Sequence, residues 1–107
     1  MAVRLDKAWS EVAQAQRSLK GQMGVFHLGN ASGEVIYIGF AGGKSLHGLR
    51  AEVIETAEGL SDAYYYRVEV TTAYRTRFRE LMMVHYADYG CYPKHNEALP
   101  LGKLSPG

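Results

Sequence analysis

Basic side chains near one predicted helix give this sequence its first chemical signal. Arg75 and Arg79 are four residues apart, so they share one face of a helix, while Arg77 points elsewhere. A guanidinium can form two parallel hydrogen bonds with phosphate oxygens, and arginine is therefore well suited to bind phosphate groups. Arg67 and Lys44 add cations that could contact the same phosphates. The alternative is a basic helix face that is only solvated.

Three scattered residues, His85, Cys91 and His95, raise the question of a zinc site. A structural zinc ion needs four ligands, usually including a closely spaced cysteine pair, and these three are loosely spaced. His85 also lies on an apolar helix stripe, which favours a hydrogen-bonded core histidine over a metal ligand. Cys91 is the single cysteine, so an internal disulfide is excluded and a reducing, cytoplasmic location is expected.

Length and composition limit the kind of protein that carries these residues. The chain has 107 residues, 47% of them hydrophobic and 21% charged, which predicts one soluble domain over residues 1–107. No apolar run is long enough to span a membrane, and no secretory signal is visible. The net charge is only +1, which excludes a strongly basic nucleic-acid binder. Any phosphate-binding surface must be local.

The elements that would position the site begin with a helix. Apolar residues recur every three or four positions from Leu5 to Leu19, a spacing that predicts an N-terminal helix over about residues 6–20. Asp6 is a plausible N-cap and Gly21 a natural stop. We expect this helix to serve packing.

Three strands are predicted from apolar, β-branched and aromatic content. Residues 23–28 and 34–40 flank a linker rich in glycine, asparagine and serine, the pattern of an antiparallel hairpin. Residues 64–70 form the third strand.

Two further helices complete the pattern. Ser45 could cap a helix that buries Leu49 and Val53, and a helix over about residues 72–89 ends at Gly90. The tail, about residues 90–107, reads as irregular. The order is α-β-β-α-β-α. The predicted fold class is therefore α+β, with a three-stranded antiparallel sheet flanked by helices.

Two tripeptides carry a resemblance to a known family. Gly-Val-Phe at residues 24–26 and Tyr-Ile-Gly at residues 37–39 are separated by ten residues. This resembles the paired signature of the GIY-YIG nucleases, which include homing endonucleases, some restriction enzymes and the incision subunit of bacterial nucleotide-excision repair. The family's later arginine, glutamate and asparagine correspond to Arg50, Glu80 and Asn96. Its β-β-α-β-α core agrees with the pattern above.

The resemblance implies roles for two of these residues. Tyr37 would position or deprotonate the attacking water, which requires an assisting cation because an ordinary tyrosine has a pKa of about 10. The alternative is a core tyrosine packed on Trp9. Glu80 would hold one Mg²⁺ or Mn²⁺ ion, which polarises the scissile phosphate. Its alternative is an exposed ion-pair partner, although the positions four residues before and after it, Thr76 and Val84, offer it no base.

Arg50 would stabilise charge on the phosphate, but its position departs from the family pattern. It lies thirteen residues after Tyr37, whereas the family arginine usually lies nearer, at the position of His47. Either the loop at Gly42 and Gly43 carries an insertion, or His47 contributes instead, or the arginine site is lost. A solvated Arg50 is the plain alternative.

The remaining candidate residues are assigned to substrate binding. Phe26 stands where the family usually has a second tyrosine, so the packing is kept and the hydroxyl is lost. Asn96 resembles the late asparagine that holds the active-site backbone, and a turn-forming asparagine explains it equally well. Lys44 and Arg67 would contact phosphates.

The sequence thus predicts a magnesium-dependent endonuclease that hydrolyses phosphodiester bonds in nucleic acid, with DNA as the expected substrate. The alternative is a catalytically impaired GIY-YIG-like domain that binds nucleic acid or a protein partner without cleavage, as Phe26 and the late Arg50 would suggest. An unrelated α+β domain with a chance signature is the third interpretation.

Overall fold

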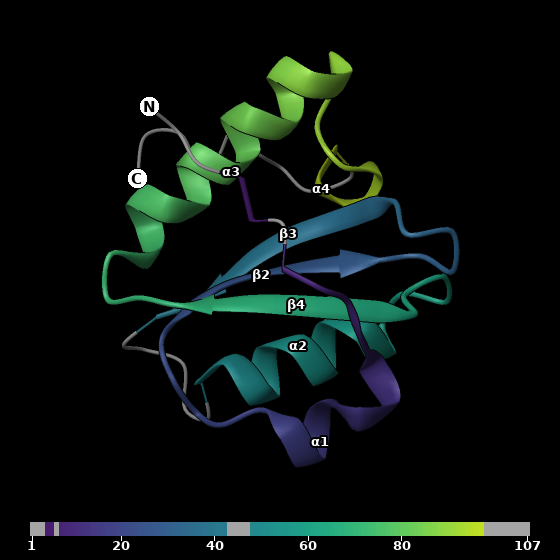
Figure 1. Ribbon diagram of the computed structural model, residues 1–107, viewed down its shortest axis with the longest axis vertical. Helices are drawn as coiled ribbons and strands as arrows, with labels where there is room; N and C mark the ends of the chain where they lie inside the picture. The colour runs from purple at the N-terminus through teal and green to yellow at the C-terminus, as the bar shows by residue number, and fades with distance from the viewer. Residues whose placement is uncertain (1–3, 6, 43–47, 98–107) are drawn as a thin grey trace.

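A four-stranded antiparallel sheet forms the centre of the fold in the computed structural model, which describes residues 4–5, 7–42 and 48–97 (Figure 1). The strand order is β1-β4-β2-β3. The strands are β1 (Ser10–Glu11), β2 (Gly24–Gly29), β3 (Val35–Ala41) and β4 (Tyr65–Val70). The α+β class and the three predicted strands are confirmed. The fourth strand, β1, was not predicted, because two residues are too short to give a sequence signal.

Helices cover both faces of the sheet (Figure 1). One face carries α2 (Gly48–Glu58) and α1 (Ala15–Ser18), the latter preceded by the 3₁₀ turn η1 (Val12–Gln14). The opposite face carries α3 (Tyr74–Tyr89), and α4 (Lys94–Glu97) lies against β3. The long helix predicted over residues 72–89 is confirmed, and it ends at Gly90 in the left-handed conformation, as predicted.

Each face of the sheet has its own hydrophobic cluster. Below α2, the largest buried side chains include Phe26, Leu28 and Leu49. Below α3, the cluster contains Leu5, Val25, Ile38, Leu81 and Met82. Because β2 is buried along its whole length, its alternate residues serve both clusters.

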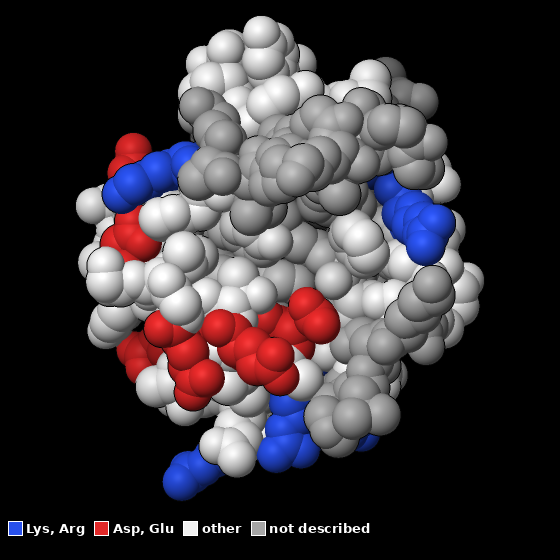
Figure 2. Space-filling view, turned by 180° about the vertical axis from the view of Figure 1, so that it is seen from behind, with Lys and Arg blue, Asp and Glu red and all other residues white. Residues whose placement is uncertain are grey.

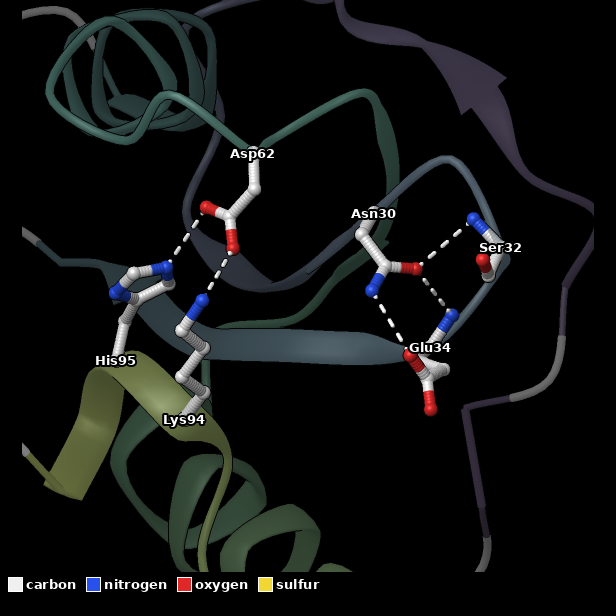
Figure 3. Close-up of polar contacts among 6 residues, drawn as sticks. All are labelled: Asn30, Ser32, Glu34, Asp62, Lys94 and His95. Carbon is white, nitrogen blue, oxygen red and sulfur yellow. Dashed lines mark hydrogen bonds and ion pairs between the residues drawn. The ribbon is translucent and has the colours of Figure 1, made fainter.

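The turn between β2 and β3 is organised by Asn30. Its Oδ1 accepts hydrogen bonds from the backbone N–H groups of Ser32 and Glu34, both at 3.0 Å (Figure 3). Gly33 takes a positive φ of 83° within this turn. Asparagine and glycine are favoured in such turns for these two reasons, and the predicted hairpin is confirmed.

A β-bulge changes the register just after this turn. Leu28 pairs with Tyr37 but Gly29 pairs with Val35, so Ile36 is the additional residue. As a result, Ile36 and Tyr37 both pack in the cluster below α2, although they are adjacent in the sequence. The bulge therefore fixes which face of the sheet receives the Tyr37 side chain.

The N-terminal helix predicted over residues 6–20 is confirmed only in part, since residues 12–18 are the helical ones among those that the structure describes in this segment. The apolar residues of this segment pack on opposite faces of the sheet. Trp9 lies against Gly29 and Arg67 on the α3 side, whereas Ala15 belongs to the cluster below α2. A single straight helix cannot serve both faces, so the chain passes round the β4 edge through β1. The predicted irregular tail contains the short helix α4, and residues 98–107 lie outside the described residues.

Candidate functional site

Tyr37 lies on the α2 side of the sheet and is half-buried. Its ring packs against Phe26, with a centroid distance of 6.0 Å, rather than against Trp9. Burial, with a smaller contribution from the Glu52 carboxylate, raises the pKa of the Tyr37 phenol above 10.0. Both effects disfavour the phenolate, so this environment opposes a role as a general base.

Arg50 is exposed in the first described turn of α2 and faces α1 instead of Tyr37. It lines a hollow of about 690 Å³ together with Gln16, Ile54 and Glu58. Positions 50 and 52 are about 200° apart on a helix, so Arg50 and Glu52 point to opposite sides of α2. The charged residue of α2 that acts on the phenol of Tyr37 is thus Glu52, a carboxylate, and not Arg50. His47 and Lys44 lie outside the described residues.

Glu80 lies on the other side of the sheet, within an ion-pair network centred on Arg77. The buried Arg77 guanidinium donates from Nε and Nη2 to the two carboxylate oxygens of Glu69 at 2.8 and 3.0 Å. Its Nη1 donates to Glu80 at 3.1 Å. Hydrogen bonds from this guanidinium to Glu69, opposed in part by burial, raise the pKa of Arg77 above its ordinary value. Glu80 therefore does have a basic partner, three residues earlier in its own helix.

This network does not fit a magnesium site. A divalent cation would have to bind Glu80 beside the guanidinium that already bridges Glu69 and Glu80, and like charges repel. Within residues 4–5, 7–42 and 48–97, no group of three or more acidic, histidine or cysteine residues is gathered closely enough to hold a metal ion. The place between the two carboxylates that a metal ion would take is occupied by the Arg77 guanidinium, which supplies one positive charge.

Phe26 is a core residue, not a substrate ligand. Its side chain is buried below α2, and across the ladder it faces Gly39. A Cβ atom at Gly39 would come within 2.5 Å of the Phe26 ring. A Cβ atom at Gly24 would likewise overlap the backbone of Glu69. Packing thus accounts for both glycines of the two tripeptides.

Asn96 is fully buried and binds the outer edge of β3. Its Oδ1 accepts a hydrogen bond from the Ile38 N–H at 2.7 Å, and its Nδ2 donates to the Ile38 carbonyl at 2.9 Å. The side chain takes the place of a neighbouring strand, which satisfies two backbone groups that would otherwise be unpaired. Asn96 therefore holds the backbone of the Tyr-Ile-Gly segment.

Arg67 is engaged within the protein. Its guanidinium stacks over Trp9 at 4.1 Å, and its Nη1 donates to the Lys7 carbonyl at 3.1 Å. Its Nε donates to Nδ1 of His27 at 3.1 Å. These contacts tie the N-terminal segment to the α3 face and give Arg67 a structural role, so it is not positioned primarily for phosphate.

The exposed side of α3 carries basic and aromatic side chains. Arg75 and Arg79 are exposed and form no ion pair or hydrogen bond with any residue that the structure describes. Farther along the helix, Met83, Tyr86 and Tyr89 are 68, 50 and 69% exposed. The opposite face differs in charge, because acidic side chains gather over α2, which carries Glu52, Glu55 and Glu58 (Figure 2).

A groove of about 580 Å³ lies between the β2–β3 turn, α3 and α4. Asp62 at its rim accepts hydrogen bonds from Lys94 Nζ at 3.0 Å and pairs with His95 Nε2 at 2.8 Å (Figure 3). These contacts lower the pKa of Asp62 below 3.8, with the His95 contact as the larger cause. No local sequence pattern predicts this cluster, because Asp62 lies more than thirty residues before Lys94 and His95.

A family model matches residues 3–88, and its description is a domain of unknown function, DUF7508. The chain belongs to this family. The DUF7508 match contains all four strands, α2 and nearly all of α3, and it ends before Asn96. No GIY-YIG family model matches, and no curated protein or solved structure does either. Among the described residues of this DUF7508 domain, no helix is long and apolar enough to cross a membrane.

Proposed function

We propose that this domain binds nucleic acid through the exposed side of α3 and does not cleave it. The fold proposed is GIY-YIG-like. Its support is the order hairpin, helix, strand, helix, followed by an asparagine in α4 that binds the backbone of the Tyr-Ile-Gly strand. The observation that carries the absence of cleavage is the separation of Tyr37 and Glu80. Tyr37 packs against the cluster below α2, whereas Glu80 is paired with Arg77 on the α3 side of the sheet.

Phosphodiester hydrolysis requires the attacking water, the metal and the charge-stabilising group to meet at one phosphate. Here the three candidates are separated by the sheet and by α2. Tyr37 faces Glu52, Arg50 faces α1, and Glu80 is bound to Arg77. One phosphate cannot contact all three, which favours binding over catalysis.

Binding is supported by the chemistry of the α3 surface. Two cations a helical turn apart can each contact a phosphate, and they release counterions when they do so. Tyr86 and Tyr89 present exposed rings farther along the same helix, and such rings stack with unpaired bases. Single-stranded nucleic acid combines both ligands, so we expect it to bind more tightly than duplex. The acidic α2 face would repel the phosphates and so leaves α3 as the binding side.

The test is fluorescence anisotropy with labelled single-stranded and duplex oligonucleotides over a range of salt concentrations. The variant Arg75→Ala/Arg79→Ala should weaken binding and reduce the slope of log K against log salt by roughly 1.5. The matched control is Arg17→Ala/Lys20→Ala, which removes the same charge from exposed positions near α1. Equal losses in the two variants would contradict a specific α3 surface, and so would the absence of salt-dependent binding.

Cleavage is tested separately with supercoiled plasmid and Mg²⁺ or Mn²⁺. We expect no nicking above the level of a buffer control. Metal-dependent nicking that disappears in Glu80→Gln would contradict the proposal and restore the endonuclease hypothesis.

A further inference from the structure

The groove beside α4 has the size and the lining of a pocket for a small, flat ligand. Its volume is about 580 Å³, which lies within the range of pockets that hold small-molecule ligands. Tyr89 and Tyr92 contribute aromatic rings to the lining, and Val35, Ile36 and Pro93 contribute apolar surface. A flat aromatic ligand can stack against such a lining.

Tyr89 belongs both to this groove and to the exposed side of α3. Its side chain is 69% exposed, so the ring is open to a ligand. Arg79 lies ten residues earlier in the same helix, about 15 Å away along the helix axis. A single strand that contacts Arg79 through a phosphate can therefore extend to Tyr89 and turn one base into the groove. The groove thus adjoins the surface proposed for nucleic acid.

Asn30 and Glu34 line the same groove and are fixed relative to each other. Oδ1 of Asn30 is held by two backbone N–H groups of the turn, so its Nδ2 faces Glu34 and donates to Oε1 at 3.0 Å (Figure 3). Nδ2 has a second N–H, and Oε2 of Glu34 has no hydrogen-bond partner among the residues that the structure describes. A carboxylate oxygen can also accept more than one hydrogen bond. The pair therefore presents, in order, one donor (Nδ2) and two acceptors (Oε1 and Oε2).

The second carboxylate of the groove lining is already engaged. One oxygen of Asp62 accepts a hydrogen bond from Lys94 at 3.0 Å, and the other pairs with His95 at 2.8 Å. Figure 3 shows these three residues as a group separate from Asn30 and Glu34. Glu34 therefore supplies the carboxylate oxygen that is available to a ligand.

Guanine is the base whose hydrogen-bonding edge complements this pair. Its O6 accepts, and its N1–H and N2–H donate, in that order, whereas adenine and cytosine each offer a single donor group beside their acceptors. Hydrogen bonds to an ionised carboxylate are stronger than those to a neutral acceptor. Unpaired bases are commonly recognised in this way, by stacking on an aromatic side chain and by hydrogen bonds to the Watson–Crick edge.

We propose that this groove binds one unpaired guanine of a single-stranded nucleic acid. The base stacks on Tyr89, and its O6, N1 and N2 edge bonds to Asn30 and Glu34. The inference rests on the proposed function for the strand that carries the base. It adds a preference for guanine, which the phosphate contacts of Arg75 and Arg79 cannot provide.

The first experiment measures binding of nine-residue thymidine oligonucleotides that carry a single central guanine, hypoxanthine or adenine. Hypoxanthine lacks only the N2 amino group of guanine, and the wild-type protein should bind the guanine oligonucleotide about tenfold more tightly. Glu34→Gln keeps an acceptor for Asn30 but places an amide nitrogen among the acceptors. It should remove the preference and leave the affinity for unsubstituted oligothymidine unchanged. The matched control is Glu58→Gln, which removes the same charge at an exposed position of α2 and should keep the preference.

The second experiment tests the groove without the α3 surface. Guanosine and inosine, which carry no phosphate, are titrated separately into the full ¹⁵N-labelled chain, and the backbone amides of Glu34 and Tyr89 are followed. We expect saturable shifts with guanosine and weaker binding of inosine. This comparison also remains decisive if Glu34→Gln does not fold, because it uses the wild-type protein.

The two experiments separate the groove from the α3 surface. Oligonucleotides that bind in a salt-dependent way but without a guanine preference, together with no guanosine shift, would overturn the groove proposal and leave the proposed function in place. Guanosine shifts without oligonucleotide binding would do the reverse. Equal affinity for guanosine and inosine would overturn the assigned contacts. A groove that responds to methylguanidinium and not to guanosine would be a cation site, which would also overturn the proposal.

Discussion

Phe26 and Gly39 face each other across the β2–β3 ladder, and the aromatic ring lies over the glycine. The ring is buried, and its Cζ would be 2.5 Å from a Cβ atom added to Gly39. Aromatic side chains commonly cover a strand glycine in this way, because the missing side chain leaves room for the ring. The tripeptides that suggested a nuclease signature are thus also explained by a cross-strand packing pair.

Gly39→Ala should destabilise the protein by roughly 1–3 kcal/mol, the usual cost of adding an atom to a filled core. The new methyl group would overlap the Phe26 and Tyr37 rings, and neither ring can leave without exposing the cluster below α2. Urea denaturation measures the change. Gly59→Ala is the matched control, since its Cβ would make only ordinary contacts of 3.5 Å or more. Equal effects at both positions would argue against specific overpacking.

Asn96→Ala should cost about 2–4 kcal/mol, because it leaves the N–H and the carbonyl of Ile38 buried without partners. Asn96→Asp keeps the shape but places a carboxylate against the Ile38 carbonyl, and it should be at least as damaging at neutral pH. Thermal unfolding and hydrogen exchange at the Ile38 amide measure the loss. An Ile38 amide that remains equally protected in Asn96→Ala would contradict the pairing.

The strands and α3 were predictable because their signals are local. Alternating and continuous apolar residues, turn-forming Asn30 and Gly33, and the helix stop at Gly90 each act within a few residues. The N-terminal helix is shorter than predicted for the opposite reason. Trp9 and Val12 have helical spacing, but they pack against different faces of one sheet. The spacing of apolar residues predicts that they share a helix face, but it does not indicate which surface of the protein buries each of them.

The candidate site was less predictable than the fold. Tyr37, Arg50 and Glu80 follow one another along the chain in the order that the resemblance requires. Whether their side chains come together depends on the direction in which each strand or helix points them. The bulge at Ile36 sets the side of Tyr37, and the helical angle between positions 50 and 52 turns Arg50 away. The partner of Glu80 is Arg77, which lies three residues earlier in the same helix. Asn96 binds the backbone of Ile38, next to Tyr37.

Glu69 and Glu80 share Arg77 unequally, and two substitutions should separate them. Glu69→Gln removes the bidentate partner of a buried guanidinium and should cost roughly 1–3 kcal/mol. Glu80→Gln changes a single hydrogen bond at a side chain that is more exposed than that of Glu69, and it should cost less than about 1 kcal/mol. Urea denaturation of both variants measures the order.

The same variants test the metal prediction. We expect Mg²⁺ to leave the melting temperature of the wild-type protein unchanged, because the Arg77 guanidinium already bridges both carboxylates and would have to be displaced. A ligand that binds only the native state would raise it. An increase with Mg²⁺ in the wild type that is lost in Glu80→Gln would show that the ion competes successfully with Arg77.

Stability should fall as the pH is lowered from about 6.5, and His27 should be the main cause. Its pKa is lowered from 6.5 to about 3 in the native state, so between these values the unfolded chain binds a proton that the folded chain does not. The free energy of unfolding then decreases by about 1.4 kcal/mol for each pH unit lost in this window. Asp62 and Asp88 add nothing at the upper end, because the pKa values of both carboxyl groups are lowered below 3.8 and they remain ionised there.

Urea denaturation at about pH 6.5 and about pH 5 should therefore show a loss of roughly 2 kcal/mol in the wild type. His27→Gln should remove most of this loss, since the amide keeps an acceptor for Arg67 but cannot titrate. The matched control is His85→Gln on α3, which leaves His27 buried and should keep the slope. A His27→Gln protein with an undiminished slope would show that another group charges on unfolding in this range and that the His27 ring is less shielded than its burial indicates.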